Sequence, residues 1–578
     1  MTTTKTKSKR KSQQSQAVVR IVIIAAILVC INVLASRVHF GLDLTSEKRF
    51  TLSDATKEML ARVDDPVTVD IYMKGEFPAG IEHLRDAVAE KLNNFNSYTK
   101  SKITYTYIDP FEGKTEDEKG PIYQQLAEKG VVGIMLDITS ADNTTSQKMI
   151  FPYALVHYKG KSVAVRIMES GSVRDNAEKL TISESLLEYK LASAIHKMEM
   201  PAPPEIAYMV GHGEPLGWET YDMLTSLSMN YFLDTLDLVS EVYIPSTFDA
   251  IIINKPASSI KEQEKLKLDQ YVMRGGRILW CLDPVRTPLD SLQYTDNVLA
   301  IDQFLNLDDM LFNYGVRVNA DLVQDMQCFV LPVTVGRTEQ GQSQIEGRNW
   351  MYYPIFLPTS RHPIVNNMDG ILGKFVSSID TVGTGDIKKT VLLESSKYSR
   401  RAPTPHRVSL SMLQFPMKEE MFQQPYLPAA VLVEGNFESI FRTKISDLTT
   451  TYLRDVQKRP YMDKTDSPTA MIVIGDGDIF LNEVQPTTGP IPMGASRGTK
   501  AQFANRNFLL NCMEYLTDKN SLLEARTKDA RVRLLDGGRV KEEGNKWRII
   551  NIAVPVAIVL LFASAYLFFR KRRYAEKK

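Results

Sequence analysis

Residues 250–282 read AIIINKPASSIKEQEKLKLDQYVMRGGRILWCL, and this stretch decides the fold of the largest part of the chain. Its apolar run Ala250–Ile253 predicts a buried strand, Glu262–Met273 has the spacing of an amphipathic helix, and Arg277–Leu282 predicts the next strand. Two adjacent glycines end the helix. Strand, helix and strand in this order are typical of a parallel sheet with helices on its faces.

The same alternation continues on both sides of this stretch. The other expected elements are strands over Ile206–Val210, up to Tyr243-Ile244-Pro245, over Ala429–Val433 and over Ala470–Ile474, and helices over Tyr221–Ser228 and Asn505–Leu516. We therefore expect an α/β fold with a mostly parallel, doubly wound sheet. Proline, glycine and aromatic residues dominate 317–427, where we expect irregular insertions.

A smaller α/β unit is expected before Pro201-Ala-Pro-Pro204, which marks a hinge. Its expected strands are Val67–Tyr72, Ile103–Ile108, Val131–Leu136 and Met149–Leu155 or Val163–Ile167; its helices carry Leu84, Val88, Leu92 and Phe95, and Gln124–Lys129. The order β-α-β-α-β-β resembles a thioredoxin-like fold without its cysteines. Thr181 and Glu184 form a capping-box pattern that predicts the start of a helix.

Two apolar runs lie near the ends of the chain. Ala17–Ala35 is interrupted only by Arg20 and Asn32, and Ile549–Phe569 is apolar for most of its 21 residues. About 20 such residues cross the hydrocarbon core of a bilayer as a helix. The first run is also compatible with a cleaved signal peptide, but its length favours an uncleaved anchor.

The charge of the chain is unevenly distributed. The net charge is +1, but residues 1–16 and 570–578 carry +5 each, which leaves −9 for residues 17–569. Basic residues concentrate on the cytoplasmic side of membrane spans. We therefore expect both termini in the cytoplasm, close to anionic lipid headgroups, and residues 36–548 outside.

Composition excludes several classes of protein. A hydrophobic fraction of 43% and a charged fraction of 24% are typical of globular proteins. Four cysteines without a C-x-x-C pair argue against a disulfide scaffold, a zinc site and a dithiol redox site. An acidic body argues against nucleic-acid binding.

Two glycine-flanked polar motifs follow predicted strands, where open α/β sheets bind ligands. One reading is structural, with glycines permitting tight turns and polar side chains satisfying loop amides; the other is a ligand or metal site. A His-x-Glu pair offers too few ligands for zinc, so we expect no metal. The candidate ligand or partner contacts are Gly211, His212, Gly213, Glu214, Asp476 and Asp478.

Catalytic motifs are incomplete. Residues 494–498 read GASRG, which fits G-x-S-x-G, but a loop precedes them and the last histidine of the chain, His406, lies upstream. Gly489 and Gly494 have the spacing of a P-loop, but Ala495 stands where its lysine would be. We interpret Asp109-Pro110 and His362-Pro363 as turns.

Several phrases occur in a characteristic order along the chain. They are LDLTSEKRFTLSDAT at 42–56, Gly211–Glu214, Ile252–Pro256 with Leu268–Tyr271 and Gly275-Gly276, Gly475–Asp478 with Asn482, and Arg526 before Arg531–Leu534. Together they resemble the auxiliary subunits of bacterial ABC transporters, in particular the gliding-motility-associated GldG proteins. The resemblance covers nearly the whole chain.

The resemblance implies an inner-membrane protein with a large periplasmic body. Such a protein acts with a separate permease and a separate ATPase in gliding or secretion in Bacteroidota-type bacteria. The second unit is similar to the GIFT domain of intraflagellar-transport proteins, which is related to class I glutamine amidotransferases. Those enzymes need a cysteine at a strand-to-helix elbow, whereas Cys281 is followed by Leu282-Asp283-Pro284. Enzymatic activity is therefore not expected.

These observations give a division of the chain and a predicted function. The expected parts are a cytoplasmic tail (1–16), a transmembrane helix (17–35), a thioredoxin-like domain (36–175), a GIFT-like, glutamine-amidotransferase-like domain (176–530), a juxtamembrane segment (531–548), a transmembrane helix (549–569) and a tail (570–578). The predicted function is a non-catalytic ABC transporter subunit of the inner membrane, without a cofactor and with homo-oligomerisation left open. The alternative is a periplasmic ligand-binding module or enzyme that uses the loops of His212, Glu214, Asp476 and Asp478.

Overall fold

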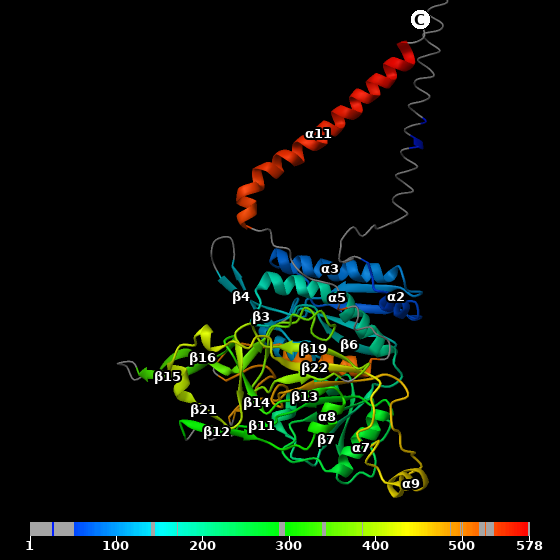
Figure 1. Cartoon of the computed structure of the whole chain (residues 1–578). Helices are drawn as coiled ribbons and strands as arrows, with labels where there is room; N and C mark the ends of the chain where they lie inside the picture. Colours follow the sequence, from blue (N-terminus) through cyan, green and yellow to red (C-terminus); the bar gives the residue numbers. More distant parts are fainter. Residues whose placement is uncertain are drawn as a thin grey trace, which may run out of the picture.

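The computed structural model describes most of the chain as two α/β units and a long C-terminal helix (Figure 1). The described residues are 51–139, 145–169, 171–287, 295–337, 343–383, 385–485, 487–497, 499, 501–518, 526 and 537–575, with Ile23, Ala26 and Ile27. In Figure 1 the first unit lies between the C-terminal helix and the second unit.

The first unit contains a four-stranded sheet with the order β2-β1-β5-β6. Its strands are β1 (Val67–Ile71), β2 (Ile103–Tyr107), β5 (Tyr153–Tyr158) and β6 (Lys161–Arg166). Strand β1 is parallel to β2 and antiparallel to β5, and β5 is antiparallel to β6. The helices α2 (Asp54–Leu60), α3 (Ala79–Asn96) and α5 (Asn176–Glu199) share one apolar core with this sheet. The spacing of Leu84, Val88, Leu92 and Phe95 predicted the buried face of α3, and all four side chains are buried.

Three details of the first unit differ from the sequence prediction. Helix α4 (Glu116–Glu128) begins before the expected Gln124, and a hairpin of β3 (Ile134–Thr139) and β4 (Thr145–Ile150) is inserted before β5. Helix α5 begins at Asn176 instead of after Thr181, because Asp175 accepts a hydrogen bond from the Glu178 N–H (2.7 Å) and caps it earlier. The Thr181 hydroxyl lies inside the helix and donates to the Ala177 carbonyl (3.0 Å).

The second unit contains a seven-stranded sheet with the order β19-β22-β23-β10-β9-β7-β8. Its strands are β7 (Glu205–Val210), β8 (Phe232–Asp237), β9 (Ala250–Asn254), β10 (Ile278–Cys281), β19 (Lys388–Glu394), β22 (Pro428–Gly435) and β23 (Thr469–Ile474). Strands β8, β7, β9, β10 and β23 are parallel; β22 is antiparallel to β23, and β19 is antiparallel to β22 and so runs in the direction of the parallel strands. The expectation of a mostly parallel sheet is confirmed.

Helices cover both faces of this sheet, because its strands are apolar on both sides. Along β9, Ala250 and Ile252 enter one core and Ile251 and Ile253 enter the other. The first core includes α6 (Tyr221–Ser228) and α10 (Asn505–Thr517), and the second includes α7 (Glu262–Met273) and α8 (Asp308–Asn313). The expected bounds of α6 and α7 are those observed.

The prediction of a strand that ends at Tyr243-Ile244-Pro245 is wrong. The strand beside β7 is β8, and its register pairs Glu205 with Phe232 and Val210 with Asp237. This pairing uses the whole of β7, so the residues after Asp237 have no strand left to pair with. They form the loop before β9.

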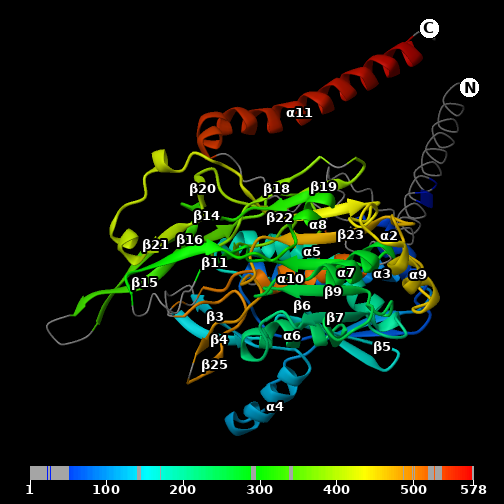
Figure 2. The ribbon, with the colours of Figure 1, turned by 60° about the horizontal axis from the view of Figure 1, so that its bottom comes forward.

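The segment expected to be irregular folds into small antiparallel sheets. It pairs β13 (Val316–Val318) with β18 (Ile379–Thr381), β14 (Asp321–Asp325) with β20 (Ser399–Pro403), and β15 (Cys328–Arg337) with β16 (Ser343–Phe356) and β17 (Ile371–Leu372). Strand β21 (His406–Ser409) pairs with β12 (Asn297–Asp302), which also pairs with β11 (Val285–Arg286). We call residues 316–409 the insertion; its β15–β16 hairpin extends away from the body in Figure 2. Apart from the β15–β16 hairpin, these strands are short and have distant partners, so they leave little periodicity in the sequence, which is why they were missed.

The C-terminal helix α11 (Gly537–Ala575) contains the second expected membrane span. Its part from Lys546 to Arg572 has the length and composition of a membrane-crossing helix, and no other helix in the described ranges has both. The first expected span, residues 17–35, lies outside the described residues apart from Ile23, Ala26 and Ile27, which are helical.

Candidate functional site

The topology brings both polar motifs to the same edge of the seven-stranded sheet. Strands β7, β9, β10 and β23 are parallel, so the residues that follow them meet at their carboxyl ends. His212 and Glu214 follow β7, Lys255 follows β9, Asp283 comes shortly after β10, and Asp476 follows β23. The order changes direction between β7 and β9, where open sheets of this kind bind ligands. We call this edge the carboxyl edge.

An ion-pair cluster forms around Lys255. Its Nζ lies 2.5 Å from Asp478 Oδ1 and 3.3 Å from Asp283 Oδ2. Burial opposes the charge of Lys255, but Asp283 and Asp478 outweigh burial and hold the pKa of Lys255 above its ordinary value. Burial raises the pKa of Asp283 to about 6, against the effect of Lys255. Two carboxylates therefore share one ammonium group, and the nearby Asp476 adds a further electrostatic contribution.

Asp476 binds backbone groups of the chain itself. It is fully buried, and it accepts hydrogen bonds from the N–H groups of Asp478 and Lys374 (2.8 Å each). Burial, helped by the charges of Asp283 and Asp478, raises the pKa of Asp476 well above its ordinary value. Its oxygens are satisfied in the way expected of a structural carboxylate.

The insertion covers this part of the carboxyl edge. The Ser377 N–H donates to the Gly475 carbonyl (2.6 Å), and a Cβ added at Gly475 would lie 2.1 Å from the Ser377 carbonyl oxygen. A Cβ at Gly373 would lie 3.3 Å from Asp476 Oδ2. Glycine at 475 is thus needed for the close approach of two backbones. The Gly-Asp-Gly-Asp motif is where the insertion packs against the end of β23.

A second cluster is built around His212. The His212 Nε2 lies 3.1 Å from Glu264 Oε2, and the His212 N–H donates to Glu214 Oε2 (2.8 Å). All three side chains are buried. Burial raises the pKa of Glu214. Burial opposes ionisation of Glu264 as well, but the Lys261 N–H and His212 outweigh it and lower the pKa of Glu264.

The glycines of this motif allow the turn that places His212. Gly211 and Gly213 have φ values of 104° and 84°, in the left-handed region that favours glycine. The His212 carbonyl accepts hydrogen bonds from the Ala257 N–H (2.8 Å) and the Ser258 N–H (3.0 Å). The loop after β7 is therefore fastened to the loop after β9.

The structure divides the predicted site residues between these two clusters. Among the described residues, no hydrogen bond or ion pair links His212 or Glu214 with Asp476 or Asp478. Within the same ranges, no group of three His, Cys, Asp or Glu side chains has a metal-binding arrangement. Sequence reasoning missed Lys255, Asp283 and Glu264. The position of Lys255 and Asp283 after predicted strands was a signal that could have found them.

Ser496, Cys281 and His362, which belong to the other motifs considered in the sequence, have structural roles. Ser496 is buried, and its hydroxyl donates to Glu483 Oε1 (2.8 Å). Burial raises the pKa of the Cys281 thiol well above its ordinary value, so the thiol is a poor nucleophile. The His362 ring packs against Tyr515 with centroids 5.0 Å apart, and burial lowers the pKa of His362 to about 4.

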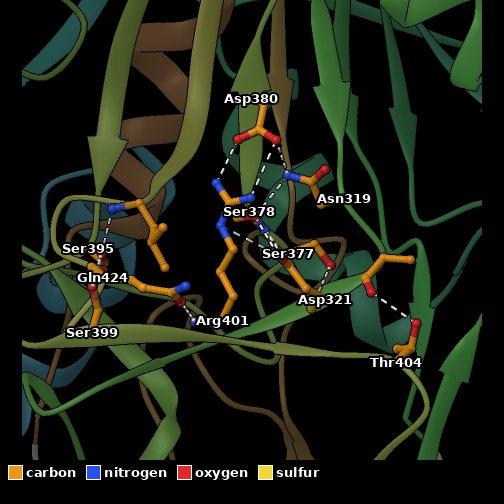
Figure 3. Close-up of polar contacts among 12 residues, drawn as sticks. Asn319, Asp321, Ser377, Ser378, Asp380, Ser395, Ser399, Arg401, Thr404 and Gln424 are labelled. Atoms are coloured by element: carbon orange, nitrogen blue, oxygen red, sulfur yellow. Dashed lines mark hydrogen bonds and ion pairs between the residues drawn. The ribbon is translucent and has the colours of Figure 1, made fainter. Parts of the chain in front are cut away.

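A polar network fixes the insertion in place (Figure 3). Asp321 accepts hydrogen bonds from the Ser378 N–H (2.8 Å) and the Ser378 hydroxyl (2.6 Å). Arg401 Nη2 lies 2.6 Å from Asp380 Oδ1, and Asn319 Nδ2 donates to Asp380 Oδ2 (2.9 Å). These contacts join β13, β18, β14 and β20. They stabilise the insertion in its position over the carboxyl edge.

A family model described as an ABC-type uncharacterized transport system matches residues 203–512, which is more than half of the chain. The chain belongs to this family. Membership supports an accessory role in an ABC-type transport system, in association with transporter components. A second family model, described as a domain of unknown function, matches residues 46–157.

Similar proteins add little about chemistry. An uncharacterized protein of Borreliella burgdorferi is 20% identical over 560 residues, which cover 92% of this chain and 94% of that protein. The mmIFT52 N-terminal domain is 13% identical with a TM-score of 0.30, over 54% of this chain and 97% of that domain. The exo-beta-1,4-mannosidase Op5Man5 of Opitutaceae bacterium strain TAV5 is 12% identical with a TM-score of 0.17, over 56% of this chain and 43% of the enzyme. At these scores neither structure bears on fold or function.

Proposed function

We propose that this protein is a non-catalytic, membrane-anchored auxiliary subunit of an ABC transporter and acts with separate permease and ATPase subunits. The observation that supports this most is the match of residues 203–512 to the transport-system family. In the proposal, helix α11 and the run at 17–35 anchor the chain in a bacterial inner membrane. The two units then lie in the periplasm, and both termini lie in the cytoplasm.

The filled carboxyl edge supports the non-catalytic part of the proposal. The place where open sheets bind ligands is occupied here by the chain itself, because Lys374 and Ser377 of the insertion bind Asp476 and Gly475. His212 is bound to the buried carboxylate of Glu264, and Lys255 is bound to the partly buried carboxylate of Asp478. A substrate would have to displace these contacts.

The finer assignments rest on narrower support. The strand order β2-β1-β5-β6, with one parallel and two antiparallel pairings, supports a thioredoxin-like first domain, but α5 shares its core beyond the proposed boundary at 175. The GIFT-like second domain and the gliding or secretion context rest on the resemblance of the motifs. Contact of the basic tails with anionic lipid follows from their charge of +5 each.

Co-purification tests the proposed assembly. The full chain with an affinity tag, extracted in mild detergent from its own bacterium, should recover one permease and one ATPase in amounts comparable to its own. A matched control exchanges the apolar part of α11 for an unrelated membrane helix and separates anchoring from specific contact. Recovery of the chain alone, in several mild detergents, would overturn the proposal.

Cysteine labelling tests the proposed topology. The cysteines at 281, 328 and 512 are buried, and Cys30 is replaced by serine in the labelling variants, so a cysteine introduced at an exposed position dominates labelling in intact cells. We expect Glu420→Cys, on the surface of the second unit, to react with a membrane-impermeant maleimide from outside the inner membrane. We expect Ala575→Cys to react only after the membrane is opened. The reverse pattern would contradict the orientation.

A further inference from the structure

A large cavity lies outside the two carboxyl-edge clusters and shares none of their charged residues. It holds about 840 Å³ and lies between the loop 239–249, helix α7 and the segment 441–459, which contains helix α9 (Asp447–Asp455). We call it the α9 groove. Its volume is in the range of ligand-binding pockets, about 300–1,000 Å³.

Three cations of the groove are bound only by uncharged oxygens. Arg274 Nη2 donates to the Pro460 carbonyl (2.6 Å), and Arg459 Nη1 donates to the Ile244 carbonyl (3.0 Å). Lys267 Nζ donates to the Leu238 carbonyl (2.7 Å) and the Glu241 carbonyl (2.6 Å). Among the described residues, no carboxylate lies within ion-pair distance of these three cations.

The groove therefore has an excess of positive charge. Burial lowers the pKa of Arg274, and the charge of Arg459 lowers it further, so the two guanidinium groups repel each other. Two of the acids that line the groove already have partners: Glu262 pairs with Lys265 (2.9 Å) and Asp249 accepts from the Glu205 N–H (3.1 Å). Glu241 is the third acid. Its single negative charge is smaller than the combined positive charge of Arg274, Arg459 and Lys267.

Apolar side chains stand exposed around these cations. Val239, Val242 and Tyr243 are exposed on the loop side, and the Arg459 guanidinium lies 4.0 Å from the centroid of the Tyr243 ring. On the other side Tyr452 lines the groove. Apolar groups of this size beside charged donors are typical of binding surfaces.

Helix α9 extends the apolar surface beyond the groove. Its Leu448, Tyr452 and the following Val456 lie four residues apart, on one face of the helix. Leu448 is 83% exposed and Val456 is 64% exposed, and α9 has no buried residue among those described. An amphipathic helix normally turns its apolar face to a core, so this face lacks its partner.

We propose that the α9 groove binds an acidic peptide segment of a partner protein, with apolar residues between its acids. Carboxylates of the segment would bind Arg274, Arg459 and Lys267, because guanidinium and ammonium groups form strong charge-assisted hydrogen bonds with them. Its apolar residues would contact Tyr243 and the stripe of Leu448, Tyr452 and Val456. The stripe continues outside the cavity, which favours an extended segment over a compact small molecule.

The position of the groove indicates where such a partner comes from. In Figure 1 α9 lies at the opposite end of the body from α11. The proposed segment therefore belongs to a protein that meets the chain on the side away from its membrane helix. This inference does not depend on the transport role, because it rests on the charges and exposed apolar groups of the groove alone.

A peptide selection tests the proposal without a known ligand. The full chain in detergent is used to select from a phage library of random 12-residue peptides. We expect enrichment of sequences in which Asp or Glu alternates with Leu, Phe or Tyr. Enrichment of basic or uncharged sequences would overturn the proposal.

The selected peptide is then synthesised, and its affinity is measured by fluorescence anisotropy. We expect Arg274→Gln with Arg459→Gln to weaken binding at least tenfold. The matched control is Arg442→Gln with Arg454→Gln, which removes the same net charge from arginines already paired with Glu438 (3.0 Å) and Asp455 (2.8 Å). Equal weakening by both double variants would mean non-specific attraction and would overturn the site.

A second variant guards against misfolding. Leu448→Ser with Val456→Ser changes only exposed side chains, and we expect it to weaken binding several-fold without changing the unfolding transition. No effect of this variant would contradict the apolar part of the proposal. Analytical ultracentrifugation of each protein completes the test: a dimer that the arginine variant alone dissociates would make a second copy the occupant and overturn the assignment to a partner.

Discussion

The carboxyl edge and the α9 groove of the second unit are both rich in charged side chains, but their charges are matched in different ways. At the carboxyl edge Lys255 lies among carboxylates, with Nζ 2.5 Å from Asp478 Oδ1. In the groove, Lys267 and the two arginines bind only uncharged oxygens. A region whose charges satisfy one another has a structural role, whereas a region with unmatched charge is available to a partner. This contrast predicts that equal substitutions in the two regions have unequal effects.

The largest expected difference is between two lysine-to-methionine variants. Lys255→Met leaves the partly buried Asp283 and Asp478 without their cation, so we expect it to lower the free energy of unfolding by about 3 kcal/mol, the lower end of the range for buried pairs. Lys267→Met leaves two carbonyls that water can reach, and we expect a loss of less than about 1 kcal/mol. Urea unfolding followed by tryptophan fluorescence, to which the buried Trp280 and Trp350 contribute, measures both. Similar losses in the two variants would break the comparison.

Two glycine-to-alanine variants test the packing of the same two regions. A Cβ at Gly475 would lie 2.1 Å from a backbone oxygen of the insertion, so we expect Gly475→Ala to cost about 3 kcal/mol. Gly275 lines the groove at φ 86° with no atom within 4 Å of the added Cβ, so Gly275→Ala costs only backbone strain, about 1 kcal/mol. Proteolysis of the insertion in Gly475→Ala, but not in Gly275→Ala, would show that the insertion no longer packs firmly against the sheet.

His212→Ala is expected to cost about 2 kcal/mol, because it removes a buried hydrogen bond to the Glu264 carboxylate. His83→Ala is the matched control: His83 lies 3.6 Å from Glu184 with its side chain 73% exposed, and its loss should be within about 0.5 kcal/mol. Thermal unfolding compares the two. A stable His212→Ala protein that has lost its transport function would instead favour the ligand-binding alternative.

The pH dependence of stability gives the smallest expected effect. The pKa of Asp283 is about 6 in the folded chain and 3.8 as an ordinary Asp, so the folded state binds the proton more tightly. The stabilisation from this proton is complete below the ordinary pKa and is lost as the pH rises through 6. Between pH 5 and 7 we expect the wild type to lose about 1 kcal/mol relative to Asp283→Asn. Lys255, Asp476 and Asp478 face this group in both proteins, so an identical pH profile would contradict the assignment.

Much of the second unit follows from its local patterns. The run Ala250–Ile253 and the helix Glu262–Met273 were predicted because apolar periodicity reports burial directly. The start of α5 was missed because two capping patterns lie close together, and only the packing shows that Asp175 caps the helix. Most strands of the insertion were missed because their partners are distant: Asp321 pairs with Pro403.

The candidate site shows the same limit. Strand-end position predicted that His212 and Asp476 lie at one edge of the sheet, and they do. It could not show that His212 binds Glu264 of α7, whereas Asp476 binds the backbone of Lys374. No sequence motif marks the α9 groove, because Arg274 and Arg459 are far apart in the sequence. The fold brings them together where Arg274 donates to the carbonyl of Pro460, the residue after Arg459.

The sequence by itself determined the α/β class, the parallel sheet, the apolar C-terminal helix and the uneven distribution of charge, since each depends on composition or on neighbours within a few turns or strands. The tertiary structure alone decided which charges are neutralised and which remain open. The reason is physical: the energy of a charge depends on its burial and on partners within a few ångströms, and those partners come from distant parts of the chain.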